Sequence, residues 1–104
     1  MITHDQCLQY LGIDYADDMV NANVETARNA AELTLKGAVG EDVETLLPGD
    51  ARAQTLALLY MEDYYTSHAL SETSGKQSSA YRAQVMALEW QLKLELRRRR
   101  EAGA

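Results

Sequence analysis

Residues 50–65 have the sequence DARAQTLALLYMEDYY, and this stretch decides the fold. Its apolar side chains recur at spacings of three and four residues, which is the period of one helical face; they include Ala53, Leu56, Leu59 and Tyr60. Asp50 follows a Pro48-Gly49 turn and suits an N-cap, because its carboxylate can accept hydrogen bonds from the first free helical amides. We therefore predict a helix over about residues 50–67, at the centre of the hydrophobic core.

A short helix is predicted upstream, near the start of the sequence. Thr3 and Gln6 have the spacing of a capping box, in which each side chain accepts a hydrogen bond from the other residue's amide. Gly12 is a natural helix terminator, because glycine adopts the left-handed conformation without strain. The helix is therefore expected over about residues 4–11.

An alanine-rich second helix is predicted between these two. Its apolar residues again repeat at spacings of three and four, and we place it at about residues 15–34 with Asp14 as a plausible N-cap. Gly37 and Gly40 are expected to bracket a break. Residues 41–47 are expected to form one or two helical turns or a loop, with these apolar side chains tucked in: Val43, Leu46 and Leu47.

The C-terminal part combines a polar loop with a long helix. Residues 71–79 are small and polar and predict a loop. A fourth helix is expected from about residue 78 to residue 99, with a near-heptad seam typical of helix-on-helix packing; the seam comprises Tyr81, Val85, Leu88, Leu92 and either Glu95 or Leu96. The expected fold class is all-α, a small bundle of about four helices. Residues 1–77 would form the body and residues 78–104 a basic helix of the same single domain.

Charge is unevenly distributed along the 104 residues, whose formal net charge is −6. Residues 1–75 hold 13 acidic and 3 basic side chains, whereas residues 76–104 hold 3 acidic and 7 basic ones. Such asymmetry often marks an interaction surface, and the acidic body argues against wrapping free DNA. No run approaches 18 consecutive apolar residues, so we predict no membrane-spanning helix.

Catalysis and metal binding find little support in the sequence. Cys7 has His4 three residues before it, but no oxyanion donor or orienting acid can be argued, so a small core side chain is the better interpretation. His4 and His68, even with Asp63 or Glu72, do not have the spacing of a metal-binding motif. We expect no enzymatic activity, no metal and no cofactor.

Aromatic and basic residues are the remaining candidates for binding. Tyrosines beside Trp90 could stack on bases, but Glu62 and Asp63 would repel phosphate, so core or subunit contact is the better interpretation. The run Arg97–Arg100 ends the last predicted helix. The helix dipole explains bases in a final turn. Four consecutive arginines spread around the whole helix, however, and leave a contact role open.

The order of these features resembles the head–tail connector (adaptor, or head-completion) proteins of tailed bacteriophages and related prophages. In that family a leucine-x-isoleucine-aspartate segment precedes the second helix, and a later helix begins after a proline-containing turn and ends in aromatics. The corresponding residues here are Leu11-Gly12-Ile13-Asp14, the acidic pair Asp17-Asp18, the alanines Ala27, Ala30 and Ala31, the segment 48–54 and the helix 56–65 ending in Tyr64-Tyr65. The resemblance covers about residues 3–66.

This resemblance implies a structural role in the virion. Such proteins form a ring, usually of twelve copies, beneath the portal protein at the head–tail junction, after synthesis in the cytoplasm of the bacterial host. They extend the DNA channel and present a surface to the next tail or stopper protein. DNA would pass through without specific binding, and no membrane, enzymatic activity or cofactor is involved.

Within that role, two groups of residues are candidate contact sites. The basic helix would dock on the portal or a neighbouring subunit through Leu92, Leu96, Arg97, Arg98, Arg99 and Arg100. Contacts between subunits, or core packing, would use Tyr60, Tyr64, Tyr65, Tyr81 and Trp90.

Two other functions stay open. The basic helix could make the chain a small nucleic-acid-binding module, whose binding would be sensitive to salt. Alternatively, a helical regulator could dimerise through the seam between Tyr81 and Leu96.

Overall fold

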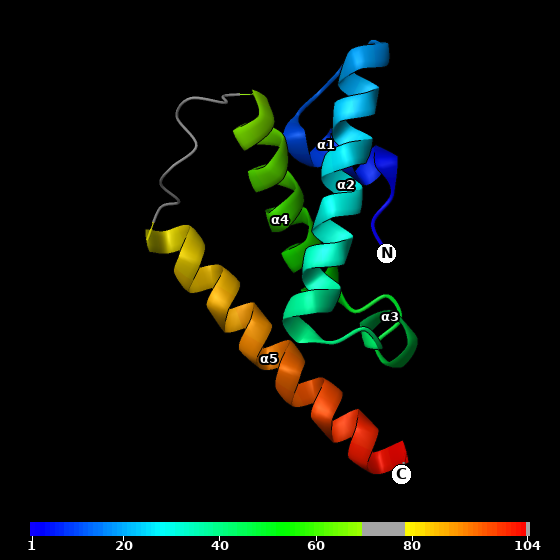
Figure 1. Ribbon diagram of the computed structural model, residues 1–104, viewed down its shortest axis with the longest axis vertical. Helices are drawn as coiled ribbons and strands as arrows, with labels where there is room; N and C mark the ends of the chain where they lie inside the picture. The colour runs from blue at the N-terminus through cyan, green and yellow to red at the C-terminus, as the bar shows by residue number, and fades with distance from the viewer. Residues whose placement is uncertain (70–78, 104) are drawn as a thin grey trace.

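The chain folds into α-helices, as the computed structural model shows for residues 1–69 and 79–103 (Figure 1). The helices, in order, are α1 (His4–Leu11), α2 (Asp18–Val39), α3 (Val43–Leu46), α4 (Ala51–Ala69) and α5 (Ser79–Gly103). The prediction of an all-α fold is confirmed. Among the described helices, none is both long and apolar enough to cross a membrane.

The starts of α1 and α4 are set by the caps that the sequence predicts. Thr3 Oγ1 accepts a hydrogen bond from the Gln6 amide at 3.1 Å, and Gln6 Oε1 accepts one from the Thr3 amide at 2.8 Å. Gly12 ends α1 in the left-handed conformation, with φ of 72°. Asp50 Oδ1 accepts from the amides of Arg52 and Ala53 at 2.8 and 3.1 Å and so begins α4. Each cap satisfies amides that lack a partner inside the helix.

The boundaries predicted for α2 are wrong at both ends. The helix begins at Asp18 rather than near residue 15, because Asp17, not Asp14, caps it by accepting from the Val20 amide at 2.8 Å. It also continues through Gly37 to Val39. A glycine inside a helix costs only about 1 kcal/mol, and burial of the flanking apolar side chains outweighs that cost.

The remaining elements follow the sequence more closely. Residues 43–46 form a single turn, α3, with Val43 and Leu47 buried and Leu46 half-buried. The helix α5 begins at Ser79, as expected, but ends at Gly103, four residues beyond the predicted end. The loop predicted at residues 71–79 lies outside the described residues except for Ser79.

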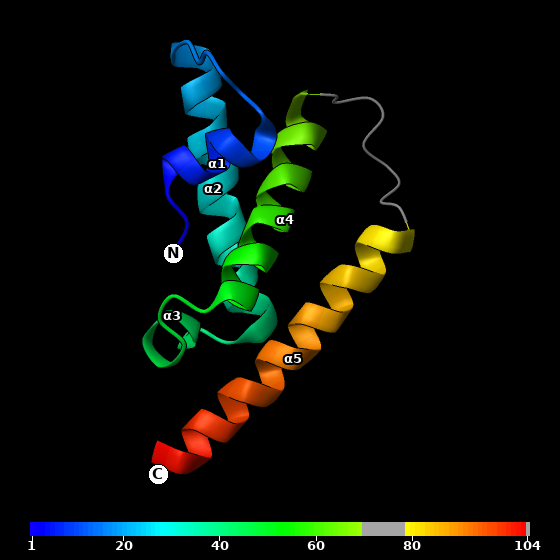
Figure 2. The same ribbon diagram turned by 180° about the vertical axis from the view of Figure 1, so that it is seen from behind.

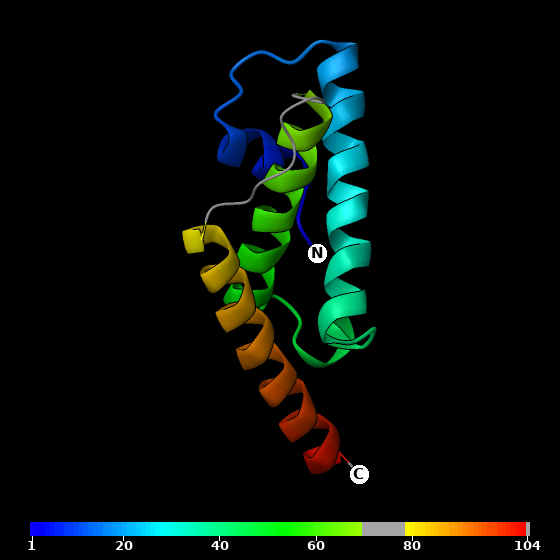
Figure 3. The ribbon, with the colours of Figure 1, turned by 60° about the vertical axis from the view of Figure 1, so that its left-hand side comes forward.

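α4 lies at the centre of the arrangement. It runs antiparallel to α2, and it has α2 on one side and α5 on the other (Figures 1 and 3). α1 packs against α2 and α4, and the lower half of α5 packs against α3 and the ends of α2 and α4 (Figure 2). The molecule measures 46 × 28 × 18 Å, with its long axis set by α5 and the α2–α4 pair.

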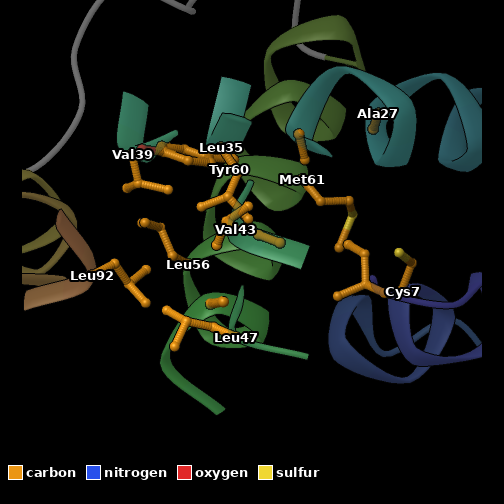
Figure 4. Close-up of a cluster of buried hydrophobic side chains, with 14 of the residues drawn as sticks. Cys7, Ala27, Leu35, Val39, Val43, Leu47, Leu56, Tyr60, Met61 and Leu92 are labelled. Carbon is orange, nitrogen blue, oxygen red and sulfur yellow. The ribbon is translucent and has the colours of Figure 1, made fainter. Parts of the chain in front are cut away.

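One apolar cluster joins all five helices. In the close-up, Leu92 of α5 lies beside Leu56 of α4, with Val39 and Leu47 near them (Figure 4). The other end of the cluster is formed by Met61 and, from α1, Cys7. The core members are Ile2, Cys7, Val24, Ala27, Ala31, Leu35, Val39, Val43, Leu47, Ala53, Leu56, Ala57, Tyr60, Met61, Leu92 and Leu96.

Two leucines on α2 provide a test of this core. Leu35 is 0% exposed and Leu33 is 72% exposed. We expect Leu35→Ala to lower the free energy of unfolding by about 2–5 kcal/mol, because it removes buried methyl groups and leaves a cavity. The control Leu33→Ala should change it by less than about 0.5 kcal/mol. Chemical denaturation monitored by circular dichroism measures both, and equal losses in the two variants would contradict this assignment of the helix faces.

Candidate functional site

The last turns of α5 are fastened to the body by Arg100. Its Nε donates to Asp42 Oδ2 at 2.7 Å and its Nη2 donates to Asp42 Oδ1 at 2.5 Å, a two-point contact between planar groups. The Arg100 guanidinium holds the pKa of Asp42 below its ordinary value. Asp42 immediately precedes α3, so the contact fixes the end of α5 against the short helix α3.

Gly40 makes room for this contact. Its φ of 142° is a conformation that other residues rarely adopt. A Cβ atom built on Gly40 would overlap Arg100 Nη2 and lie 2.9 Å from Asp42 Oδ1. The sequence signal for this glycine was a helix break, whereas in the structure Gly40 also lets the guanidinium approach the backbone.

The three preceding arginines face solvent. The side chains of Arg97, Arg98 and Arg99 are 77%, 77% and 56% exposed. Their ion pairs are within α5 itself: Arg97 with Glu101 at 3.3 Å, and Arg98 and Arg99 with Glu95 at 3.8 and 3.9 Å. Exposed pairs of this kind contribute little free energy. These guanidinium groups are therefore accessible to an acidic partner.

Leu92 and Leu96 do not belong to the docking surface that the sequence predicted. Both are 0% exposed, and both belong to the apolar cluster of this chain. They lie on the inward side of α5, as its heptad-like seam requires. Of the six residues proposed to dock a partner, the arginines are the ones that are exposed.

Tyr60 and Tyr81 connect the upper part of α5 to α4. Tyr60 is 7% exposed, and its hydroxyl donates to Glu89 of α5. The Tyr81 hydroxyl donates to the backbone carbonyl of Leu59 at 3.2 Å. Burial raises the pKa of Tyr81 to about 12, so the hydroxyl is a donor at neutral pH. Both residues thus hold helices of the same chain together.

The other three aromatic candidates are more exposed. Tyr64 is 41% exposed and shares a 2.6 Å hydrogen bond with Thr34 of α2, and Tyr65 is half-buried against the core. Trp90 is 64% exposed on α5. An open hollow of about 380 Å³ lies between α2, α4 and α5; Thr34, Tyr60, Tyr64, Tyr81, Val85, Met86 and Glu89 are among its lining residues.

A polar network around His4 ties α1 to α2. His4 Nδ1 lies 2.7 Å from Glu25 Oε2 and its Nε2 lies 2.8 Å from Asn21 Oδ1. Both partners are acceptors, so the network favours the doubly protonated ring, and these two hydrogen bonds raise the pKa of His4. Arg28 donates to Glu25 through two atoms, and together with His4 lowers the pKa of Glu25 to about 2. The sequence suggested a surface histidine and gave no sign of this network.

Cys7 is a core side chain rather than a nucleophile. It is 0% exposed, and burial raises the pKa of its thiol to about 11. A reactive thiolate instead requires a thiol pKa below its ordinary value. Among the described residues, no group of three or more His, Cys, Asp or Glu side chains is placed to hold a metal ion. Glu72 and the side chain of His68 lie outside the described part of the chain.

Comparisons with family models, with curated proteins and with solved structures found no match to this chain. The functional interpretation therefore depends on its own residues. These offer binding features: a cationic tip on α5 formed by Arg97, Arg98 and Arg99, and exposed apolar side chains on α2 and α5.

The His4 network predicts a dependence of stability on pH. The folded-state pKa of His4 is raised above 6.5, so its contribution is complete below pH 6.5 and is lost as the pH rises through the raised value. The contribution of Glu25 is present above its ordinary pKa of 4.5 and is lost as the pH falls toward about 2. We therefore expect the free energy of unfolding to decrease as the pH rises above 6.5.

Urea denaturation at several pH values between about 6 and 9 measures this decrease. The variant His4→Gln should lose most of it, because glutamine does not titrate. The matched variant His68→Gln should retain it. A decrease of equal size in His4→Gln and in the unmodified chain would contradict the assignment to His4.

The contact between Arg100 and Asp42 leads to a prediction about the mobility of the last two turns of α5. We expect Arg100→Gln to speed amide hydrogen exchange in the last two turns of α5, because the contact that fastens them is lost. Asp42→Asn should have the same effect, and the double variant should add little to either single change. The control Arg97→Gln removes only a pair within α5 and should leave exchange nearly unchanged. Additive effects of the two changes would show that these residues act independently.

Proposed function

We propose that this chain is a head–tail connector of a tailed bacteriophage or prophage, a structural subunit that forms a ring under the portal and joins head to tail. Residues 3–66 support the proposal through their resemblance to that family: the capped α1, the Leu11–Asp14 segment, the alanine-rich α2 and the apolar α4 ending in aromatics. The all-α fold agrees with it. In this proposal the chain acts by assembly and catalyses no reaction.

The observation that carries the proposal is the arm formed by the end of α5. In all three ribbon views, this end of the helix extends past α3 and away from the α2–α4 pair (Figures 1, 2 and 3). It presents the exposed guanidinium groups of Arg97, Arg98 and Arg99, while Arg100 fastens it to the body. A cationic tip held in a fixed position loses little freedom on binding and suits carboxylates of an acidic partner surface.

The acidic body suits a channel through which DNA moves. Residues 1–75 hold 13 acidic and 3 basic side chains, and each of the three bases, Arg28, Lys36 and Arg52, is paired with an acid of the chain. DNA binds proteins mainly by exchanging its counterions for lysine and arginine. A wall without available cations would let DNA pass without holding it.

Replacing the three exposed arginines tests the docking role. The triple variant Arg97→Glu, Arg98→Glu, Arg99→Glu should lose co-purification with the portal protein encoded by the same viral genome, because the cationic tip becomes anionic. The matched control Arg82→Glu makes the same change at an exposed arginine near the other end of α5 and should retain binding. Both variants should keep the helical circular dichroism spectrum. Retention of portal binding by the triple variant would overturn the docking role.

Nucleic-acid binding by the same arginines is the second candidate function, favoured by their exposure. It predicts that the isolated chain shifts DNA in a gel at low salt and releases it as salt rises. Absence of a shift at low salt would remove this candidate. The dimeric regulator is not favoured, because the seam through which it would pair is occupied by contacts within the chain, with Leu92 and Leu96 fully buried.

A further inference from the structure

The outward side of α5 carries an exposed apolar row, whose first member, Met86, also borders the hollow between α2, α4 and α5. Met86, Trp90 and Leu94 follow one another at four-residue intervals and are 68%, 64% and 42% exposed. Trp90 points about 160° away from the buried Leu92, because each residue turns an α-helix by about 100°. A helix that is apolar on two opposite sides is suited to packing between two partners. Its own body covers one side only.

A second exposed face lies on α2. Met19 and Leu33 are 73% and 72% exposed. Between them, at spacings of four and three residues, lie three uncharged residues: Thr26 is exposed, and Asn23 and Ala30 are half-buried. A hollow of about 140 Å³ opens at this level, lined by Asn23, Thr26, Ala27, Ala30 and Tyr64. This face offers large side chains at its ends and a recess in the middle.

We propose that α5 of one copy docks antiparallel on α2 of the next copy, with Trp90 in the recess. The α5 row from Met86 to Leu94 spans about 12 Å at 1.5 Å per residue and fits within the α2 face from Met19 to Leu33, which spans about 21 Å. With Trp90 opposite Thr26, the small Ala83 meets the large Leu33. At this position a large side chain thus opposes a small one, as close packing requires.

Charge complementarity selects this partner and this direction. The antiparallel register brings Arg97 and Arg98 to the N-terminal end of α2, where Asp17 and Asp18 are exposed. Two α5 helices paired with each other would instead oppose like charges: in the antiparallel arrangement centred on Trp90, Arg82 of one copy would meet Arg98 of the other. Like-charge juxtaposition costs binding energy. A second copy therefore fits the α5 row through its α2 face rather than its α5 face.

The two faces belong to different helices, α2 and α5 (Figure 3). Contacts between different faces continue from copy to copy and close into a ring when the rotation allows. The inference deepens the proposed function by naming the surfaces through which subunits meet, and it rests on that function for the closed ring as the end product.

The single tryptophan provides a direct probe. As chain concentration rises, Trp90 emission should shift to shorter wavelength and quenching by acrylamide should fall by about half or more, because a side chain now 64% exposed becomes covered. One helix pair makes a small interface, so we expect a Kd on the order of 0.1 mM. A chain that is monomeric by sedimentation at about 1 mM, with unchanged emission, would overturn the proposal.

A mixing experiment tests whether the contact joins different faces. Leu94→Glu places a charge in the α5 face, and Leu33→Glu places one in the α2 face. Each variant alone should be monomeric. An equimolar mixture should recover a dimer of twice the chain mass, since one intact face of each kind remains. Gln91→Glu, exposed on α5 beside the row, should associate like the unmodified chain. Circular dichroism checks that all variants stay helical.

Two results would contradict the α5-on-α2 contact: Leu33→Glu associating as well as the unmodified chain, or the mixture staying monomeric. Portal binding is measured separately on the unmodified chain, because the arginine variants would disturb both contacts. Portal binding that persists while the mixture fails would overturn this inference alone. A mixture that dimerises while the chain neither binds portal nor enters virions would overturn the proposed function alone.

Discussion

The structure depends on α4, whose apolar side chains must be buried by two other helices, α2 and α5. Alanines allow α2 and α4 to pack closely. Ala27 and Ala31 of α2, and Ala53 and Ala57 of α4, are all at most 3% exposed. Small side chains let helix axes approach and fill the space between them without voids. The second cover is α5, whose Leu92 and Leu96 close the lower part of the core. Because α4 needs both covers, α5 belongs to the fold even though its tip extends beyond it.

Local features of this chain could be predicted from the sequence. The capping box at Thr3, the glycine stop at Gly12 and the cap at Asp50 each depend on residues within a few positions, and all three are as expected. The seam of α5 was also predictable, because helical periodicity shows which residues share a side. Which surface the seam would face was not predictable, and Leu92 and Leu96 were wrongly assigned to a partner.

Contacts between residues far apart in the chain could not be predicted from the sequence, for a physical reason. Arg100 and Asp42 are 58 positions apart, and nothing in the local pattern of either residue points to the other. The same holds for His4 and Glu25, 21 positions apart. The sequence does not predict the end of α2, because the low helix propensity of Gly37 is a local property, whereas the burial of Leu35 and Val39 comes from the tertiary fold.

The exposed row on α5 also affects how the protein behaves as a concentrated solution. Its chains repel one another through a net charge of −6 near neutral pH, and that repulsion vanishes near the isoelectric point of about 4.8. Met86, Trp90 and Leu94 remain exposed at that pH, so attraction between apolar surfaces is then unopposed. The free chain should therefore be least soluble in mildly acidic buffer. The exposed apolar row of α5 thus favours storage near neutral pH, where the net charge keeps the chains apart.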